Sequence, residues 1–191
     1  FRIRTNIKDF DINKLPALFP KKEENKIEEE KSEKLQADPL QVIGVSKHMC
    51  GAASDLTIYS LLNANEGAHV KGFMISTCCH HRCGKDLYCD NSYLEAIGIE
   101  SKLHKALFHV SSWGVYHENP AKGIQKEEKK DPIEPDRDLK TLLGLTAKRI
   151  LDIGRVLFLR KKGYNCYLLK FCDQTYSPEN FVIIGRKFEN A

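Results

Sequence analysis

The sequence predicts an α/β fold in which a parallel pair of strands is followed by helices and a C-terminal antiparallel hairpin. Residues 42–77 are predicted to form strand, helix and strand, an order that implies a parallel pair joined by a right-handed crossover. Residues 141–162 have the broad apolar face of a long helix. The apolar stretches 164–172 and 181–187 flank a short polar connector, which favours a hairpin.

The remaining elements follow from local patterns along the chain. Residues 1–12 are predicted to be a short strand and its exit. The compact apolar runs at 42–46 and 72–77 are typical of buried strands. Apolar positions recur with helical spacing across 52–64, and residues 92–110 have a helical pattern as well.

Two charged stretches interrupt these elements. Residues 21–36 and 118–138 lack periodic apolar side chains. They cannot bury enough surface to offset the entropy of ordering, so they are predicted to be flexible insertions. A lone solvated helix is the alternative for 21–36. The remainder of 1–191 is expected to belong to one domain.

Composition narrows the class of protein. The chain has no run of about 18 apolar residues, which argues against a transmembrane helix. Its start at Phe1 does not look like a signal peptide and is expected to be the interior of a longer protein. Seven cysteines without such a signal favour reduced thiols, and hence the cytosol or the nucleus. The net charge of +4 permits a polyanionic partner without proving one.

A parallel α/β sheet that finishes with a reversed hairpin is typical of class I methyltransferases, whose sheet is Rossmann-like. On this interpretation 1–12 hold the third strand, 42–46 the fourth and 72–77 the fifth, and the hairpin supplies the last two. Such folds bind their cofactor through a Gly-rich turn after the first strand. No G-x-G segment follows a strand here, so the N-terminal strands and the Gly-rich turn are expected to be missing from this chain.

Polar clusters at two consecutive strand exits predict a functional site. The first exit, a predicted polar turn, carries Lys47, His48, Cys50 and Gly51, and the second carries Cys78, Cys79, His80, His81 and Cys83. Ligands of open α/β sheets bind beyond the carboxyl ends of the strands, and neighbouring strands lie about 5 Å apart. We therefore expect 42–46 and 72–77 to be adjacent, with His48 and His80 facing one cleft.

The same segments carry a family resemblance. SKHMCGAASDL, at 46–56, resembles the SKHLCGAATDL motif of the eukaryotic tRNA 2′-O-methyltransferase family often called tRNA methyltransferase thirteen. CCHHRC, at 78–83, resembles the CCHH motif of that family. Further matches are Ser111-Ser112-Trp113, the pattern of Arg149, Asp152, Gly154 and Arg155, and Ser177-Pro178-Glu179-Asn180.

The resemblance implies methyl transfer from S-adenosylmethionine to a ribose 2′-hydroxyl at position four of a tRNA acceptor stem. Carried onto this sequence, it implies catalytic residues among His48, Asp55, His80 and His81. It implies cofactor contacts from Asp9, Lys47, Cys50 and Gly51. It implies substrate contacts from Arg82, Ser112, Trp113, Arg149 and Arg155.

Several of these residues also have a purely structural interpretation. His48 suits a general base because imidazole titrates near neutral pH, or it hydrogen-bonds backbone and shapes its turn. Asp55 orients a base, or it is a carboxylate favoured by the helix dipole. Lys148, Asp152 and Arg155 share one helix face. The basic residues of this helix either contact phosphates or form a solvated helix face; they are Lys148, Arg149, Arg155, Arg160, Lys161 and Lys162. Trp113 stacks on a base or anchors the core.

The Cys78 to Cys83 cluster could bind zinc, but its spacing argues against a metal site. Zinc sites usually need two separated ligand pairs, whereas Cys78 and Cys79 are adjacent. Adjacent side chains on an extended chain point opposite ways. A catalytic thiolate is a second alternative, since Cys50 and Cys79 could lie close together. Methyl transfer to oxygen does not need one, so these cysteines are expected to shape the pocket.

Two rival functions fit the same residues. One is a non-catalytic RNA-binding or assembly module that kept the fold and lost the chemistry. The other is a methyltransferase that acts on a small molecule or a protein. His48, Cys50, Asp55 and the pair His80-His81 argue against a pure scaffold, because a scaffold has no physical need of them at strand ends.

Overall fold

The computed structural model describes residues 2–15, 40–64, 68–115 and 136–187. Their centre is a four-stranded mixed sheet with the order β1-β2-β4-β3. The strands are β1 (Leu40–Cys50), β2 (Ala68–Cys78), β3 (Tyr164–Lys170) and β4 (Phe181–Lys187). β1 and β2 are adjacent and parallel, as predicted, and β3 and β4 form the predicted antiparallel hairpin. The hairpin joins the pair through β4, which runs antiparallel to β2.

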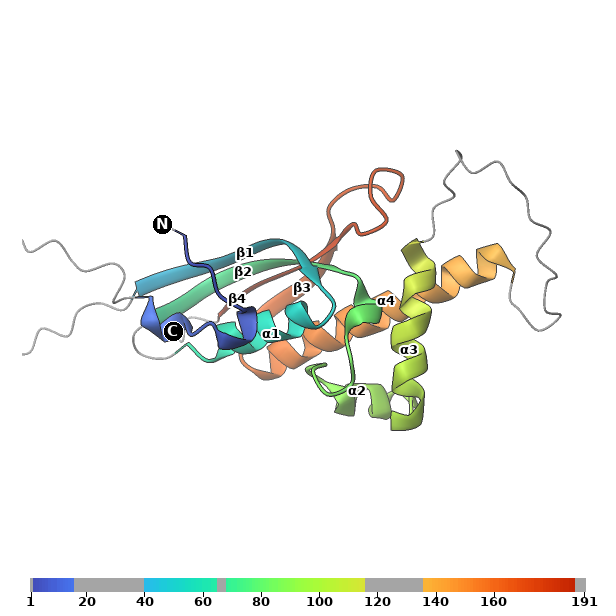
Figure 1. The fold of residues 1–191 in the computed structure, drawn as a ribbon, viewed down its shortest axis with the longest axis horizontal. Helices are drawn as coiled ribbons and strands as arrows, with labels where there is room; N and C mark the ends of the chain where they lie inside the picture. The colour runs from blue at the N-terminus through green and yellow to red at the C-terminus, as the bar shows by residue number, and fades with distance from the viewer. Residues whose placement is uncertain (1, 16–39, 65–67, 116–135, 188–191) are drawn as a thin grey trace, which may run out of the picture.

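Two helices cover one face of this sheet (Figure 1). α1 (Ala52–Leu62) is the predicted crossover between β1 and β2, and α4 (Arg137–Lys161) is the predicted long helix. The core between the layers includes Ile58 of α1, Leu159 of α4, and Phe73, Ile75 and Ile183 of the sheet. Because α1 begins where β1 ends, the start of α1 lies at the carboxyl end of the parallel pair.

The opposite face of the sheet is open among the described residues. Val45 pairs with Met74, Met74 with Ile184, and Ile184 with Tyr167, so these four side chains form one row. Val45 is 67% exposed, Met74 44% and Tyr167 49%. The sheet therefore has one dry face and one apolar face that no described helix covers.

Short helices fill the region between β2 and α4. They are η4 (His80–Arg82), α2 (Asn91–Ala96), η5 (Ser101–Leu103), α3 (His104–Val110) and η6 (Ser111–Val115). The sequence predicted one helix over 92–110, but the structure breaks it into pieces. Gly98, with φ of +87°, follows α2 and turns the chain. Tyr88, Leu94, Phe108 and Leu151 form a second core cluster beneath these pieces.

The prediction of a strand in 1–12 is wrong. The described residues of this segment form two 3₁₀ turns, η1 (Ile7–Asp9) and η2 (Ile12–Lys14). The carboxamide of Asn6 accepts from the backbone N–H of Lys8, and the carboxylate of Asp11 accepts from that of Asn13. Such local bonds compete with strand pairing.

The charged insertions lie mostly outside the described residues, which omit 16–39 and 116–135. The second predicted loop, 118–138, extends too far by a short margin, because α4 already begins at Arg137. Asp136 caps α4 by accepting from the N–H of Leu139 at 2.8 Å. Among the described residues, no helix combines the length and apolarity needed to cross a bilayer.

Candidate active site

A bulge distorts β1 next to its carboxyl end. Ser46 pairs with Ile75 and Met49 with Thr77, so β1 uses one more residue than β2 over this interval. The extra length falls on Lys47 and His48, both of which are exposed. The strand resumes through Cys50, so the polar turn predicted for this segment is wrong and these residues remain in the sheet. Bulges re-aim side chains and recur beside active sites, and this bulge presents His48 to solvent.

The turn after β1 is held against the end of β2. The N–H of Gly51 donates to the carbonyl of Cys78 at 2.9 Å. Gly51 has φ of +55°, and a Cβ there would lie 2.6 Å from the backbone carbon of Arg82. A glycine is therefore required both by the backbone conformation and by the close approach of η4. The two predicted clusters do meet at one end of the sheet.

The chain reverses sharply after β2. Cys79 has φ of 47° and ψ of 44°, the left-handed conformation, and η4 follows it directly. This turn sends His80 inward, where it is 1% exposed, while His81 and Arg82 stay exposed. The expectation that His48 and His80 face one cleft is therefore wrong for His80. His81 is the histidine of this turn that remains at the surface.

His81 and His48 form the exposed part of the site. Partial desolvation, together with the positive charges of Arg82 and Lys148, lowers the pKa of His81 below its ordinary value. A lowered pKa keeps imidazole neutral, and so able to accept a proton, over a wider pH range.

A dry ionic network lies behind this surface. Nε2 of His80 is 2.8 Å from Oδ1 of Asp152, and the hydroxyl of Thr77 donates to Oδ2 of the same carboxylate at 3.1 Å. Arg155 donates from Nη1 to Asp152 at 3.0 Å and from Nη2 to Asp55 at 2.7 Å. Burial opposes ionisation of Asp152, but His80, Arg155 and Arg149 outweigh it and lower its pKa to about 2.

The network joins four segments of the chain, which are α1, residues 77–83, Cys89 and α4. Asp55 on α1 also accepts from the backbone N–H of Cys89 and from the thiol of Cys83. Burial, followed by the charge of Asp55, raises the pKa of Cys83 to about 12. Asp152 and Arg155 come from α4. One guanidinium between two carboxylates thus fixes α1 and α4 relative to the ends of β1 and β2.

Asp55 and Arg155 are 0% and 1% exposed, so neither can touch a substrate in this conformation. Asp55, expected to orient a base, and Arg155, expected to contact phosphate, form an internal ion pair with each other. His80 is enclosed in the same way by Asp152. These three residues position the site rather than line it. Nδ1 of His80 has no hydrogen-bond partner among the described residues.

An ion pair and a cation–π contact extend the network toward β4. The side chain of Lys148 is 1% exposed, and its Nζ lies 2.7 Å from Oε1 of Glu179. The guanidinium carbon of Arg149 lies 3.2 Å from the ring centroid of Phe181, a cation–π contact. Of the predicted face of Lys148, Asp152 and Arg155, all three members are buried, so that face is internal rather than solvated.

The predicted substrate residues Arg82, Ser112 and Trp113 lie on neighbouring elements. Arg82 belongs to η4 and the other two to η6, which packs against η4 and α4. Trp113 is partly buried, with His109 edge-on at 6.3 Å and Nζ of Lys140 at 5.9 Å from its ring centroid. Ser112 donates to the carbonyl of His109 at 2.8 Å. Asp9, expected to contact a cofactor, is exposed on η1 against α1 and is not gathered with these residues.

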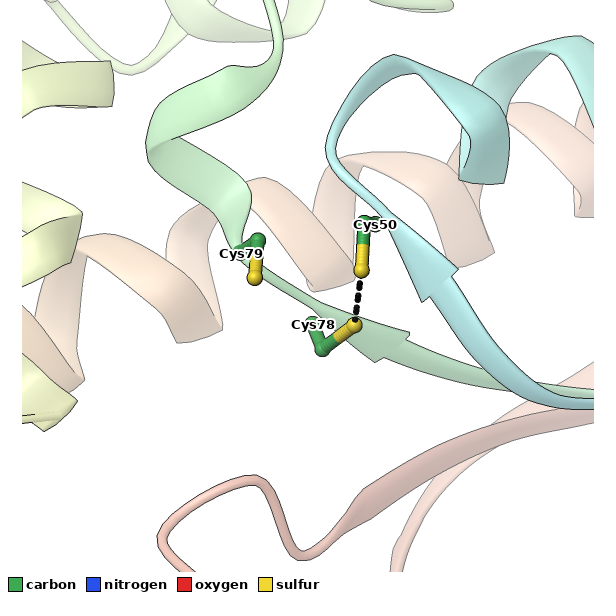
Figure 2. Close-up of side chains that lie close together, drawn as sticks. All are labelled: Cys50, Cys78 and Cys79. Atoms are coloured by element: carbon green, nitrogen blue, oxygen red, sulfur yellow. Dashed lines mark hydrogen bonds between the residues drawn. The ribbon is translucent and has the colours of Figure 1, made fainter.

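Three thiols converge where β1 and β2 end (Figure 2). The Sγ atoms of Cys50, Cys78 and Cys79 all lie within 4.8 Å of one another. Burial and hydrogen bonding to Cys50 raise the pKa of the Cys78 thiol. Cys78 and Cys79 do not point opposite ways as expected, because Cys79 is not extended.

Sequence reasoning missed Glu179 and Lys148 as partners and missed the pairing of Asp55 with Arg155. Glu179 accepts from the backbone N–H of Cys79 at 3.3 Å, across 100 residues of sequence. The available signal was the position of Glu179 in the Ser177–Asn180 motif, which resembles the family but had no role assigned to it. Contacts of such sequence separation follow from the sheet order and not from any local pattern.

Comparisons with known proteins agree with the motifs at this site. The family model described as Methyltransferase TRM13 matches residues 1–186. A tRNA:m(4)X modification enzyme TRM13 of Yarrowia lipolytica is 29% identical over 160 residues, covering 75% of this chain and 34% of that protein. The TRM13 homolog of Dictyostelium discoideum is 33% identical over 178 residues, covering 74% of this chain and 33% of that protein. That of Eremothecium gossypii is 31% identical over 159 residues, covering 78% and 35%.

The chain spans about a third of the length of these curated relatives. No solved structure matches it. The relatives carry names of tRNA modification enzymes, and the matched region includes both strand exits and the face of α4 that holds Asp152 and Arg155.

Proposed function

Since the chain belongs to the TRM13 methyltransferase family, we propose that it forms part of an enzyme that methylates a ribose 2′-hydroxyl of tRNA, with S-adenosylmethionine as the methyl donor. The acceptor is the ribose at position four of the acceptor stem. The observation that carries this proposal is the bulge that presents His48 at the carboxyl end of β1, beside the end of β2.

The sheet supports a class I methyltransferase fold. If β1 and β2 are the fourth and fifth strands of that fold, then β3 and β4 are its sixth and seventh, and the observed order is four, five, seven, six. In open α/β sheets the ligand lies beyond the carboxyl ends of the strands. Lys47, His48, Cys50 and Gly51 occupy that position on β1.

The residues present fit the methyl-bearing sulfonium end of S-adenosylmethionine but not its nucleoside. Lys47, Cys50 and Gly51 would border the donor at the end of β1, where the closed turn of Gly51 leaves the side chains of Lys47 and Cys50 exposed. When bound, S-adenosylmethionine supplies a methyl group activated by its sulfonium. The recognition of its nucleoside requires the Gly-rich turn that this sequence lacks.

His48 is the base in this proposal. Its ring is exposed on the bulge, so a ribose hydroxyl has access to it, and a neutral imidazole accepts the proton as the new O–C bond forms. His81 is the second histidine with such access, and its lowered pKa suits the same task. Asp55 and His80 are buried and paired with other side chains, which argues against this role for them.

The acceptor stem is a duplex, and RNA duplexes present 2′-hydroxyls along a shallow minor groove. Arg82 and Ser112, on the adjoining η4 and η6, are the residues we assign to the phosphates flanking the target ribose. Arg149 stacks on Phe181 at the edge of the same region and keeps part of its side chain, 24%, exposed. Trp113 anchors η6 to α4.

The test uses the protein at the full length its gene encodes, labelled S-adenosylmethionine, and tRNA transcripts that carry one 2′-deoxy nucleotide each. Deoxy substitution at position four removes the acceptor oxygen, so methyl incorporation should be lost. Deoxy substitution at position three or five should leave it largely intact. Equal incorporation into all three transcripts would refute the proposed position, and absence of incorporation into unmodified tRNA would refute the activity.

The role of His48 has a separate test. His48→Ala should lower single-turnover methylation by roughly 10²–10⁴-fold, the usual contribution of a general base. Its affinity for S-adenosylmethionine, measured by calorimetric titration, should change little. His69→Ala is the matched control, because His69 is an exposed histidine near the other end of β2. If His48→Ala retains its rate at saturating donor, the base is His81 or solvent.

A further inference from the structure

Cys50, at the end of β1, converges with Cys78 and Cys79, which lie 28 and 29 residues further along the chain. Sγ of Cys50 lies 3.1 Å from Sγ of Cys78, and the third sulfur completes a set within 4.8 Å (Figure 2). Cys50 is exposed, Cys78 is buried and Cys79 lies between these extremes. The three sulfurs therefore span from the interior to the surface.

The fold places the first two sulfurs by strand register. Cys50 and Cys78 are the last residues of β1 and β2 and are paired across the parallel ladder. The bond from the N–H of Gly51 to the carbonyl of Cys78 fixes the two strand ends immediately beyond this pair. Their side chains thus share one face of the sheet at a fixed separation.

The third sulfur arrives through an unfavourable backbone conformation. Cys79 is the only non-glycine residue with positive φ among the described residues. In an extended chain its side chain would point away from that of Cys78, and the left-handed turn instead brings it to the same group of sulfurs. Such conformations are costly for residues with a Cβ and persist mainly at functional sites.

An acidic side chain supports the strained residue. Oε1 of Glu179 accepts from the backbone N–H of Cys79 at 3.3 Å and is itself paired with the buried Nζ of Lys148. The orientation of Cys79 is therefore held from the connector before β4 and from α4 as well as from β2. Support of this kind, which orients a ligand without touching the metal, is usual around protein metal sites.

We propose that Cys50, Cys78 and Cys79 form a three-thiolate site for Zn²⁺, with the fourth position open toward solvent. Zinc prefers thiolate and imidazole ligands in tetrahedral geometry, with Zn–S distances of about 2.3 Å, which places neighbouring sulfurs about 3.8 Å apart. The set within 4.8 Å brackets that separation. Binding would require the Cys50–Cys78 pair to open from 3.1 Å toward that separation.

The open position distinguishes this site from a closed structural one. Three protein ligands and an exchangeable fourth are typical of zinc sites that bind water or an external ligand. The exposure of Cys50 provides the entry path for the ion. The site joins the ends of β1 and β2 directly beside the bulge that carries His48, and its existence does not depend on the methyl-transfer reaction.

The test is metal binding by the chain under reducing conditions. The protein is purified with a phosphine reductant, stripped with a chelator and titrated with Co²⁺, whose thiolate complexes absorb in the near ultraviolet, and then with Zn²⁺ as competitor. We expect one equivalent of Co²⁺, a thiolate-to-cobalt band, and its displacement by one equivalent of Zn²⁺. Cys50→Ser, at an exposed position, should weaken Zn²⁺ binding at least about tenfold.

Two further variants make the result specific. Cys172→Ser is the matched control, because Cys172 is partly buried like Cys79 but lies outside the group. It should bind Zn²⁺ as the unchanged protein does. Cys79→Gly removes one ligand while relieving the left-handed strain, so it should fold at least as stably without metal and bind Zn²⁺ more weakly.

Three outcomes would overturn the proposal. The first is seven titratable thiols with no thiolate-to-cobalt band. The second is a band of full intensity in Cys50→Ser. The third is Zn²⁺ affinity in Cys79→Gly equal to that of the unchanged protein. None of these depends on methylation, so failure of the zinc site and failure of the proposed activity are separately visible.

Discussion

The ends of β1 and β2 carry two sets of polar side chains that the fold treats in opposite ways. The inner network consists of Asp55, His80, Asp152 and Arg155, and each is at most 1% exposed. The outer rim consists of His48, Cys50, His81 and Arg82, and all four are exposed. Both sets come largely from the same two motifs, so sequence position alone does not separate them.

The difference shows which predicted residues are available for chemistry. In the inner network every carboxylate faces a guanidinium or an imidazole, because a buried charge without a partner is costly. In the rim the side chains are free to meet a ligand. The inner network determines where the rim lies, and the rim performs the binding and the proton transfer that we propose.

Removing the charge of Arg155 should have the largest effect on stability. Arg155→Met keeps most of the volume but leaves Asp55 and Asp152 without their shared guanidinium. Breaking a buried ion pair in this way costs about 3–5 kcal/mol, measured as the free energy of unfolding in urea. Arg82→Met in the rim is the control and should change it by no more than about 0.5 kcal/mol.

A double variant sharpens this prediction. If the cost comes from stranded carboxylates, Asp55→Asn combined with Arg155→Met should destabilise the protein by less than the sum of the two single changes. A strictly additive result would show that the two residues act independently and would contradict the network as described.

How much of this arrangement the sequence predicted depends on the range of the contacts. The parallel pair, the hairpin and the common face of Lys148, Asp152 and Arg155 follow from periodicity, which is local. The meeting of the two polar clusters followed from strand adjacency. The pairing of Asp55 with Arg155 joins residues 100 positions apart, and no periodic pattern encodes it.

Two departures from the predicted structure have local causes that the pattern of apolar residues does not encode. The turn at Cys79 is left-handed at a residue that is not glycine, and after it His80 is buried and His81 exposed. The Asx-type bonds of Asn6 and Asp11 replaced the expected strand near the N-terminus. Side-chain hydrogen bonds of this kind override propensity.

The second effect in size concerns acid stability. The pKa of Asp152 is lowered to about 2 in the folded protein, from 3.8. A depressed carboxyl pKa contributes stability above the unfolded pKa and loses it as the pH falls through the folded one. Unfolding free energy should therefore fall by on the order of 2 kcal/mol between about pH 4 and pH 2. In Asp152→Asn this part of the decline should be absent. If the free energy of unfolding, measured in guanidinium, fell equally with pH in the variant and the unchanged protein, the assignment would be contradicted.

A third effect, of comparable size, is expected from the packing that holds the inner network. A Cβ on Gly154 would lie 2.0 Å from the hydroxyl of Tyr88, which donates to the carbonyl of Leu151. Gly154→Ala should therefore destabilise the fold by about 1–3 kcal/mol, as overpacking does. At Gly84 a Cβ meets nothing within 4 Å, so Gly84→Ala should change the stability by no more than about 0.5 kcal/mol. Thermal melts of both variants measure the difference.

The smallest effect on stability should come from the rim histidines, and it is the one that separates the two regions most sharply. His48 and His81 are exposed, so His48→Ala and His81→Ala should each change the free energy of unfolding by less than about 0.5 kcal/mol. His80→Ala leaves the buried carboxylate of Asp152 without its imidazole and should cost more than either. Urea unfolding of the three variants, compared at one pH, makes the contrast direct. If His48→Ala proved as destabilising as His80→Ala, the bulge in β1 would depend on that ring for its shape, and His48 would belong with the inner network instead of the rim.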